Sequence, residues 1–440
     1  MRTKDARHTI PNMLPDLAVA PNRRFLQLAD GRPFFYLADT AWELFHRLTR
    51  EEASLYLRTR AAQGFNVIQA VALAEFDGLR VPNAYGVLPL HGEDPTRPNE
   101  AYFQHVDWIV GHAASLGLRR ALLPTWGDKW HQAHGAGPEI FNPDNAHAYG
   151  DHLGRRYREQ PIIWVLGGDR GANTDAHRAT IRAMAAGLTH GDGGRHLKTF
   201  HPRGSASSAT PFHAESWLDF NMLQSGHQGR DVANGETIAA DYALAPAKPC
   251  LDGEPCYEDH PVMDESWVPL PGEWFDDNDV RRAAYRAVFA GACGHTYGCH
   301  DVWQMYHPGR TAKNQARTPW QEALHLPGAG QMQHLRALIE SRPYFSRVPD
   351  PALASGTHTH GGLAVTRGAD DDYAMIYLPT GQPVTVQMER LGGGTMRAAW
   401  FDPRDGTCRE VGMISGRDAQ TFTPPASGSD WVLTLDRVEG

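Results

Sequence analysis

The stretch Pro161-Ile-Ile-Trp-Val-Leu-Gly-Gly-Asp169 decides the fold class. It is an apolar run that stops at two glycines and then presents one carboxyl group. A second stretch, Pro249-Cys-Leu-Asp-Gly-Glu254-Pro255, has the same design later in the chain. Such strand ends are typical of a (β/α)8 barrel, whose catalytic residues come from the carboxyl ends of different strands. We therefore predict a barrel with Asp169 and Glu254 at its mouth.

Strand-like and helix-like segments alternate between about residues 33 and 342, as expected for a parallel sheet with crossover helices. Eight apolar runs predict the strands, at 34–38, 67–72, 119–124, 162–167, 197–201, 221–224, 250–253 and 295–297. Seven segments predict helices, at 50–63, 100–116, 143–158, 175–188, 236–244, 279–290 and 330–341. The alternation predicts an α/β fold, a (β/α)8 TIM barrel.

The pattern changes after Arg342-Pro343. Short alternating runs, such as 373–378 and 431–435, are separated by turn residues and predict a small antiparallel β-sandwich. We predict two domains, a catalytic barrel with an amino-terminal extension over 1–343 and a sandwich over 347–440. Because the connection is short and poor in Gly and Ser, we expect the sandwich to pack on the barrel rather than swing on a tether.

Length and composition limit the function classes. A chain of 440 residues is long enough for a barrel and a second domain, and its net charge of −9 argues against nucleic acid as the main partner. No apolar run approaches the roughly 20 residues that span a membrane, and the first residues do not resemble a signal peptide. We expect a cytoplasmic protein with no membrane partner. Five cysteines do not suggest a disulfide framework.

Two carboxyl groups facing each other across a barrel mouth are what glycoside hydrolysis needs. Side chains alternate along a strand, so Gly167 and Asp169 are expected on one face. The fourth and seventh strands of such a barrel lie roughly opposite each other, so Asp169 and Glu254 can face one another across a substrate. The competing interpretation is that Asp169 caps a helix or pairs with Arg170, and that Glu254 belongs to a structural ion pair.

Asp252 and Glu258 compete with Glu254 for the nucleophile's role. We favour Glu254, because Asp252 lies one step deeper and is expected to orient a neighbour, whereas Glu258 lies beyond Pro255. The other strand ends carry polar groups that bind hydroxyls and indoles that cover a sugar ring, although each could instead be a buried, satisfied group. The predicted substrate-binding residues are Asp39, Trp42, Gln69, Trp126, Lys129, His201, Gln224, His227, Tyr297 and Trp303.

Five segments together resemble the apiosidase-like glycoside hydrolase family. They are Phe35-Tyr-Leu-Ala-Asp39-Thr-Ala-Trp42, Arg60-Ala-Ala-Gln-Gly-Phe-Asn66-Val, Trp164-Val-Leu-Gly-Gly-Asp169, Gln224-Ser-Gly-His227 and Asp252-Gly-Glu254-Pro-Cys-Tyr-Glu258. Members pair a (β/α)8 domain with a small C-terminal β-domain of a collagen-binding type. The resemblance implies a retaining hydrolase with Asp169 as general acid/base and Glu254 as nucleophile, and no cofactor. It also implies removal of apiose, a branched furanose, from a plant pectin side chain.

Because we find no export signal, we expect the substrate to be a short plant-derived oligosaccharide or glycoside that loses a terminal furanose-type sugar. One alternative is the same mechanism on another pentose or hexose, such as arabinose or galactofuranose. A second is a metal-dependent barrel hydrolase, suggested by 23 histidines, but such barrels carry His-x-His on the first strand. The pair His358-Thr-His360 falls in the predicted sandwich instead. A third is a non-catalytic carbohydrate-binding protein, which intact Asp169 and Glu254 argue against.

Overall fold

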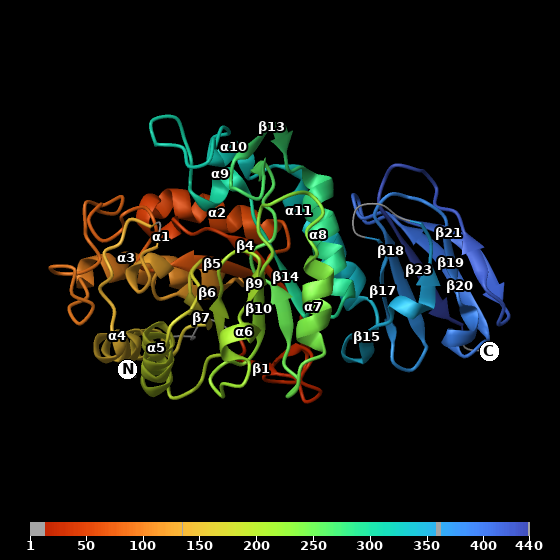
Figure 1. Ribbon diagram of the computed structural model, residues 1–440, viewed down its shortest axis with the longest axis horizontal. Helices are drawn as coiled ribbons and strands as arrows, with labels where there is room; N and C mark the ends of the chain where they lie inside the picture. Colours follow the sequence, from red (N-terminus) through yellow and green to blue (C-terminus); the bar gives the residue numbers. More distant parts are fainter. Residues whose placement is uncertain (1–13, 134, 358–361, 439–440) are drawn as a thin grey trace, which may run out of the picture.

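The computed structural model describes residues 14–133, 135–357 and 362–438. His358 and His360, the pair considered for a metal site, lie outside these ranges. Figure 1 shows a barrel with helices around it and, beside it, a separate all-β domain at the carboxyl end of the chain. Within the described ranges, no helix has the length and apolar character needed to cross a bilayer.

In the described part of the chain, the barrel is built on one nine-stranded sheet in the order β8-β7-β6-β5-β4-β14-β11-β10-β9. Its parallel strands are β4 (Tyr36–Thr40), β5 (Val67–Val71), β6 (Arg119–Leu123), β7 (Ile162–Gly167), β8 (Lys198–His201), β10 (Asn221–Gln224), β11 (Cys250–Asp252) and β14 (Gly294–Tyr297). The short β9 (Ala206–Ser207) pairs with β10 in the antiparallel sense. The predicted α/β barrel is thereby confirmed.

The gap between β8 and β10 is closed without a regular ladder. The backbone N–H of Asp219 donates to the carbonyl of Lys198 at 2.8 Å. The hydroxyl of Thr199 donates to the carbonyl of Phe220 at 2.7 Å. These bonds join the first and last strands of the parallel set, so the sheet curves into a nearly closed barrel.

Helices follow the predicted segments within a few residues. The start of α2 carries a capping box in which Thr49 and Glu52 satisfy each other's backbone N–H groups. Helices α4 and α5 lie side by side (Figure 1), and a Cβ at Gly187 would lie 2.1 Å from the carbonyl oxygen of His147. The helices are α2 (Arg50–Ala62), α3 (Glu100–Ser115), α4 (Pro143–Tyr157), α5 (Asp175–Asp192), α7 (Asn234–Tyr242), α8 (Asp277–Phe289) and α11 (Pro327–Glu340).

Several short elements were not predicted. A hairpin of β12 (Pro261–Met263) and β13 (Pro269–Trp274) lies at the top of the barrel in Figure 1. A small sheet of β1 (Leu17–Val19), β2 (Leu26–Leu28) and β3 (Pro33–Phe34) precedes the barrel. Because residues 33–34 belong to this sheet, the first barrel strand covers 36–40 rather than the predicted 34–38. Four-residue helices complete the connections: α1 (Leu44–Arg47), α6 (Ala209–Phe212), α9 (His300–Trp303) and α10 (Trp320–Ala323).

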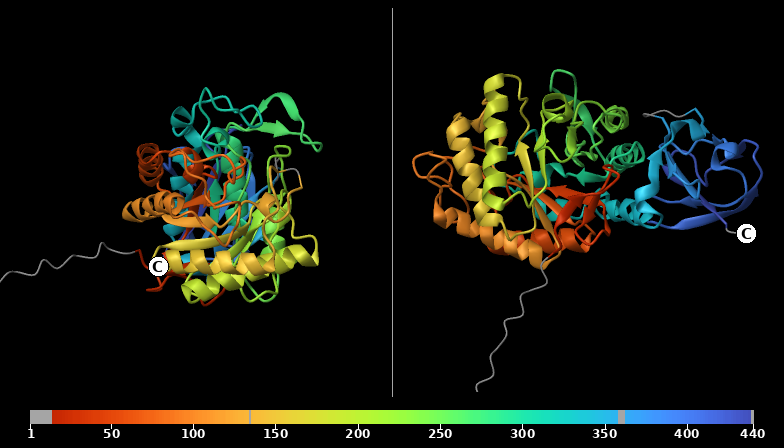
Figure 2. Two further views of the ribbon diagram at one scale, coloured as in Figure 1. Left: turned by 90° about the vertical axis from the view of Figure 1, so that its left-hand side faces the viewer. Right: turned by 90° about the horizontal axis from the view of Figure 1, so that it is seen from below.

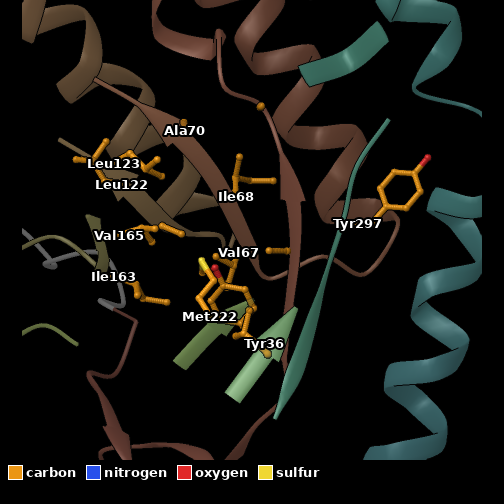
Figure 3. Close-up of a cluster of buried hydrophobic side chains, with 14 of the residues drawn as sticks. Tyr36, Val67, Ile68, Ala70, Leu122, Leu123, Ile163, Val165, Met222 and Tyr297 are labelled. Atoms are coloured by element: carbon orange, nitrogen blue, oxygen red, sulfur yellow. The ribbon is translucent and has the colours of Figure 1, made fainter. Parts of the chain in front are cut away.

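The barrel interior is a packed core rather than a pore. Figure 3 shows Val67, Ile163, Val165 and Met222 gathered inside the ring of strands. All four are buried. Bulky apolar residues of this kind are what the inside of an eight-stranded barrel requires. A substrate can therefore enter only above this core, where the strands end.

The carboxyl-terminal domain is an antiparallel β-sandwich, as predicted. One sheet has the order β15-β17-β18-β23-β20-β21 and the other β16-β19-β22. Buried residues such as Ile376, Trp400 and Leu433 form a separate core. The strands are β15 (Arg347–Pro349), β16 (Ala354–Ser355), β17 (Ala364–Gly368), β18 (Tyr373–Leu378), β19 (Val384–Val386), β20 (Thr395–Phe401), β21 (Cys408–Ser415), β22 (Gln420–Phe422) and β23 (Trp431–Arg437).

The sandwich packs directly on helix α8. The guanidinium of Arg281 on α8 donates to both carboxylate oxygens of Asp430, at 3.0 and 2.9 Å, and both residues are buried. The ring of Tyr285 stacks on that of Tyr377, with the centroids 4.8 Å apart. The right-hand view in Figure 2 shows the two domains side by side. A bidentate buried pair is costly to separate, so the domains share an interface, as expected from the short connection.

Candidate active site

A cavity of about 630 Å³ opens at the barrel mouth, where the parallel strands end. This volume lies within the roughly 300–1,000 Å³ typical of sites for small molecules. Asp169 and Glu254 both line it, together with Trp42, Trp126 and Trp303. Another hollow, of about 720 Å³, lies beside the amino end of β8 and contains none of the predicted site residues. The candidate site is therefore the cavity at the mouth.

A glycine turn places Asp169 at the end of β7. Gly167 and Gly168 both have φ of 99°, and Asp169 itself has φ of 55°. A Cβ at Gly167 would lie 2.4 Å from the carbonyl oxygen of His201, so this position accepts only glycine. The predicted strand alternation between Gly167 and Asp169 is therefore wrong, because the backbone leaves the pleat before Asp169. A left-handed non-glycine residue in a cavity is backbone strain of the kind found at functional sites.

The neighbours of Asp169 have opposing effects on the pKa of its carboxyl group. One oxygen lies 2.8 Å from Nη1 of Arg170, and this nitrogen also donates to the carbonyl of Asp169 at 2.7 Å. Burial and the negative charge of Glu254 nevertheless raise the pKa of Asp169, against the lowering effect of Arg170. The pairing with Arg170 thus exists, but it does not outweigh the effects that raise the pKa of Asp169.

The pKa of Glu254 is shifted in the opposite direction to that of Asp169. Burial opposes its ionisation, but hydrogen bonds and positive charge from His201 and His227 outweigh burial and lower its pKa to about 2. Nε2 of His201 lies 3.0 Å from one carboxylate oxygen, and Nε2 of His227 lies 3.3 Å from the other. Each oxygen of Glu254 therefore faces one imidazole. A buried carboxylate with two such partners is an anion at neutral pH.

Neighbouring side chains hold these two imidazoles in place. Nδ1 of His201 lies 3.0 Å from the carbonyl oxygen of Pro202 and 3.2 Å from the backbone nitrogen of Asp169, while Nε2 faces Glu254. The ring of His227 stacks on His260, with centroids 4.2 Å apart. Burial, and then the charges of His227 and His300, place the pKa of His260 well below its usual range. His260 is therefore neutral, and supports His227 by contact.

Half of the ten predicted substrate-binding residues line the cavity. Among them, the rings of Trp42 and Trp126 lie 5.2 Å apart, and Trp303 stacks on Phe76 at 5.4 Å. These three indoles are almost fully buried, so they form an apolar wall. His201 lies next to Glu254 without lining the cavity itself. The five lining residues are Trp42, Trp126, Gln224, His227 and Trp303.

Asp39 and Tyr297 lie outside the cavity because their strands turn these side chains toward the helices. Asp39 accepts hydrogen bonds from Tyr56 at 2.5 Å and from Arg60 at 2.8 Å, both on α2. Tyr297 donates to Glu258 at 2.5 Å, and Figure 3 shows its ring on the outer side of β14. Both residues are buried between the barrel and its helices, so we assign them to the fold rather than to substrate binding.

Lys129 and Gln69 are also placed elsewhere. Nζ of Lys129 lies 2.7 Å from the carboxylate of Asp128 and donates to the carbonyl of Ala74 at 2.7 Å. The amide of Gln69 donates to the carbonyl of Gly253 at 2.9 Å, inside the barrel. Their polar groups are used within the protein, and neither side chain lines the cavity.

The two competing acids of the seventh strand also have partners within the fold. Asp252 accepts from the hydroxyl of Ser225 at 2.7 Å and from the amide of Asn234 at 3.2 Å, as expected for an orienting residue. Burial raises its pKa to about 6. Glu258 accepts from Tyr297 and from the N–H of Gly328 at 3.1 Å, and does not line the cavity. Among the acids of this strand and loop, only Glu254 reaches the cavity.

Glu75 and Trp267 are among the cavity residues that the sequence analysis missed. Glu75 follows β5, and burial together with the charges of Asp169 and Glu43 raises its pKa to about 8. A carboxyl four residues beyond a strand could have been noticed by the rule used for Glu254. Trp267 reaches the cavity from the β12–β13 hairpin, which carries no strong strand signal. Within the described ranges, no three His, Cys, Asp or Glu side chains are arranged to hold a metal ion.

Comparisons with known proteins identify the family to which this chain belongs. The description "Apiosidase-like, catalytic domain" matches residues 20–346, and "Putative collagen-binding domain of a collagenase" matches 348–436. A search of curated proteins found no significant match. A solved structure described as a glycoside hydrolase is 34% identical, with a TM-score of 0.86 over 96% of this chain and 97% of that one. A glycoside hydrolase family 5 structure from Bacteroides vulgatus ATCC 8482 is 33% identical, with a TM-score of 0.87 over 96% and 94%. The chain therefore belongs to the apiosidase-like glycoside hydrolases.

Proposed function

We propose that the protein is a retaining glycoside hydrolase that removes a terminal furanose-type sugar, similar to apiose, from a plant-derived glycoside or oligosaccharide. Asp169 is the general acid/base and Glu254 is the nucleophile. The observation that carries this proposal is the opposite electrostatic state of two carboxyl groups in one cavity. A raised and a lowered pKa in such a pair identify an acid and an anion.

The first step needs an ionised Glu254 and a protonated Asp169 at the same time. Glu254 attacks the anomeric carbon as an anion, while Asp169 gives its proton to the leaving oxygen. The bond between the sugar and the leaving group breaks, and the sugar becomes an ester of Glu254. Because the ester carries no charge, the main negative neighbour of Asp169 disappears and the pKa of Asp169 falls.

The second step depends on the lower pKa of Asp169 in the glycosyl ester. Asp169, now ionised, takes a proton from a water molecule, and the water oxygen attacks the anomeric carbon. The ester bond breaks, Glu254 leaves as a carboxylate, and the sugar is released with its original configuration. The two imidazoles at Glu254 favour this departure because they stabilise the carboxylate form.

The residues that line the cavity are suited to binding a small terminal sugar. Trp42, Trp126 and Trp303 are almost fully buried and enclose its inner end. Gln224 and Glu75 add polar groups for hydroxyls. The family match supports apiose as the first sugar to test. Arabinose or galactofuranose, released by the same mechanism, is the alternative.

A substrate panel tests the proposal. The purified enzyme is incubated with nitrophenyl furanosides and pyranosides, then with natural glycosides, and Glu254→Ala serves as the blank. We expect release of a furanose, and proton NMR should show that the first-formed product keeps the anomeric configuration of the substrate. An inverted first product would contradict the nucleophile's role of Glu254. Sugar binding without any hydrolysis would instead favour the non-catalytic alternative.

A further inference from the structure

The β12–β13 hairpin extends the cavity beyond the strand ends. Met263, Glu265 and Trp267 of the hairpin line the cavity, as do Arg203 and Gly204, which follow β8. We call these five residues the rim. Figure 1 shows β13 above the barrel, outside the ring of parallel strands.

Trp267 is held in the rim by a defined turn. Its φ is 61°, a left-handed conformation that is an outlier for so large a residue. The carbonyl of Asp264 accepts from the N–H of Trp267 at 3.1 Å. The carboxylate of Asp264 accepts from the N–H groups of Ser266 and Val268 at 2.8 and 2.9 Å. The turn therefore fixes the indole in a strained position, which points to a functional constraint.

The indole stands over residues of the catalytic cavity. Its ring meets that of His227 edge-on, with centroids 6.3 Å apart, and His227 contacts Glu254. On another side, a Cβ at Gly204 would lie 3.9 Å from the indole. Trp267 is nevertheless 45% exposed, whereas Trp42 is 2% exposed. A large aromatic left open at a cavity is a candidate ligand contact.

We propose that Trp267 binds the leaving-group part of the substrate, meaning the sugar or phenolic ring to which the terminal sugar is attached. This rests on the proposed function. An enzyme that removes a terminal sugar takes that sugar into the closed end of its cavity, and the remainder extends to the opening. The closed end carries the buried indoles, and the opening carries Trp267. Both a sugar ring and a phenolic ring offer a flat face on which an indole stacks.

Paired substrates with the same terminal sugar test the proposal. The sugar is the one released by the wild-type enzyme, attached either to methanol or to a second sugar ring. Aromatic contacts of this kind are worth roughly two- to tenfold in affinity. We expect Trp267→Ala to raise KM by that factor for the disaccharide, with the values for the methyl glycoside unchanged and with Trp267→Phe intermediate.

The adjacent Val268→Ala is the matched control, because Val268 is 55% exposed on the same turn and does not line the cavity. Equal losses on both substrates, or no loss on either, would overturn the proposal. A second measurement needs no turnover. Trp267→Phe identifies the indole N–H signal of Trp267 in NMR spectra, and phenyl glucoside should shift that signal. An unshifted signal overturns the proposal, whereas a panel without hydrolysis overturns only the proposed function.

Discussion

The ends of β7 and β11 both present one carboxyl group to the same cavity, yet the pKa values of the two groups are shifted in opposite directions. Glu254 faces two imidazoles and has its pKa lowered to about 2. Asp169 pairs with a guanidinium, yet burial and the charge of Glu254 raise its pKa. Position on the barrel therefore brings a carboxyl group to the cavity, whereas the neighbouring charged and polar groups set the direction in which its pKa is shifted. His201 ends β8 and His227 follows β10, and both lower the pKa of Glu254.

Removing the anion should have the largest effect. Glu254→Ala leaves no group to attack the anomeric carbon, so we expect kcat to fall by more than about 10⁴-fold on every substrate. Azide, which fits the vacated space, should restore cleavage and yield a glycosyl azide of inverted configuration, as proton NMR would show. Asp252→Asn is the matched control, one step deeper on the same strand. Comparable loss in that variant would mean that the charge of β11, rather than Glu254 itself, matters.

Removing the acid should distinguish substrates by their leaving groups. For Asp169→Ala we expect a loss of roughly 10²–10⁴-fold on a natural glycoside, because the leaving oxygen is no longer protonated. Cleavage of a nitrophenyl glycoside needs no such proton, so its first step is spared and a burst of nitrophenolate should precede slow turnover. Azide should speed that turnover with retained configuration. Near-normal turnover of the natural glycoside would place the acid elsewhere.

Removing one imidazole should change the pH dependence more than the rate at neutral pH. His227→Ala takes away one of the two groups that lower the pKa of Glu254. The pKa then rises, and the acid limb of the kcat/KM profile moves to higher pH. If the pKa returned to about 4.3, the loss at pH 4 would be roughly threefold greater than at pH 7. His190→Ala, on the outer helix α5, is the control. An unmoved acid limb would mean that His227 does not act on Glu254.

Glu75 should have the smallest effect on turnover but a measurable effect on stability. Its pKa is raised to about 8 in the fold, against about 4.3 when unfolded. Between these pH values only the folded state holds the proton, so the free energy of unfolding falls as pH rises. Glu75→Gln removes this loss, and urea unfolding should show that the stability gained by the variant is about 3–4 kcal/mol larger at pH 8 than at pH 5. Equal differences at both pH values would contradict the raised pKa.

Much of this architecture could be predicted from local patterns. The apolar runs and their alternation with helices identified the eight parallel strands, since buried parallel strands are nearly continuous in hydrophobicity. Asp169 and Glu254 were predicted at the strand ends because small residues precede both. The sandwich was predicted from its period-two runs. These features depend on sequence neighbours only.

The predictions that were wrong, and the residues that were missed, depend on contacts between segments distant in the sequence. On β4 both faces are buried, so the sequence does not reveal that Tyr36 points inward and Asp39 toward α2. At β7 the two glycines end the pleat, and alternation no longer predicts the direction of Asp169. The β12–β13 hairpin is short and partly exposed, so no apolar period marks it. Trp267 and its place at the cavity were therefore missed.

The central claim, that the pKa values of the two carboxyl groups are shifted in opposite directions, is tested most directly by titration. Carbon NMR of protein labelled at Asp and Glu carboxyl groups can follow both, with Asp169→Asn and Glu254→Gln identifying the signals. We predict that Glu254 stays ionised to the lowest pH at which the fold persists, and that Asp169 takes up its proton above the usual value of about 3.9. In Glu254→Gln the pKa of Asp169 should fall, because the neighbouring charge is gone. The account would be contradicted if both groups titrated at their usual pKa values, or if the pKa of Asp169 did not change in Glu254→Gln.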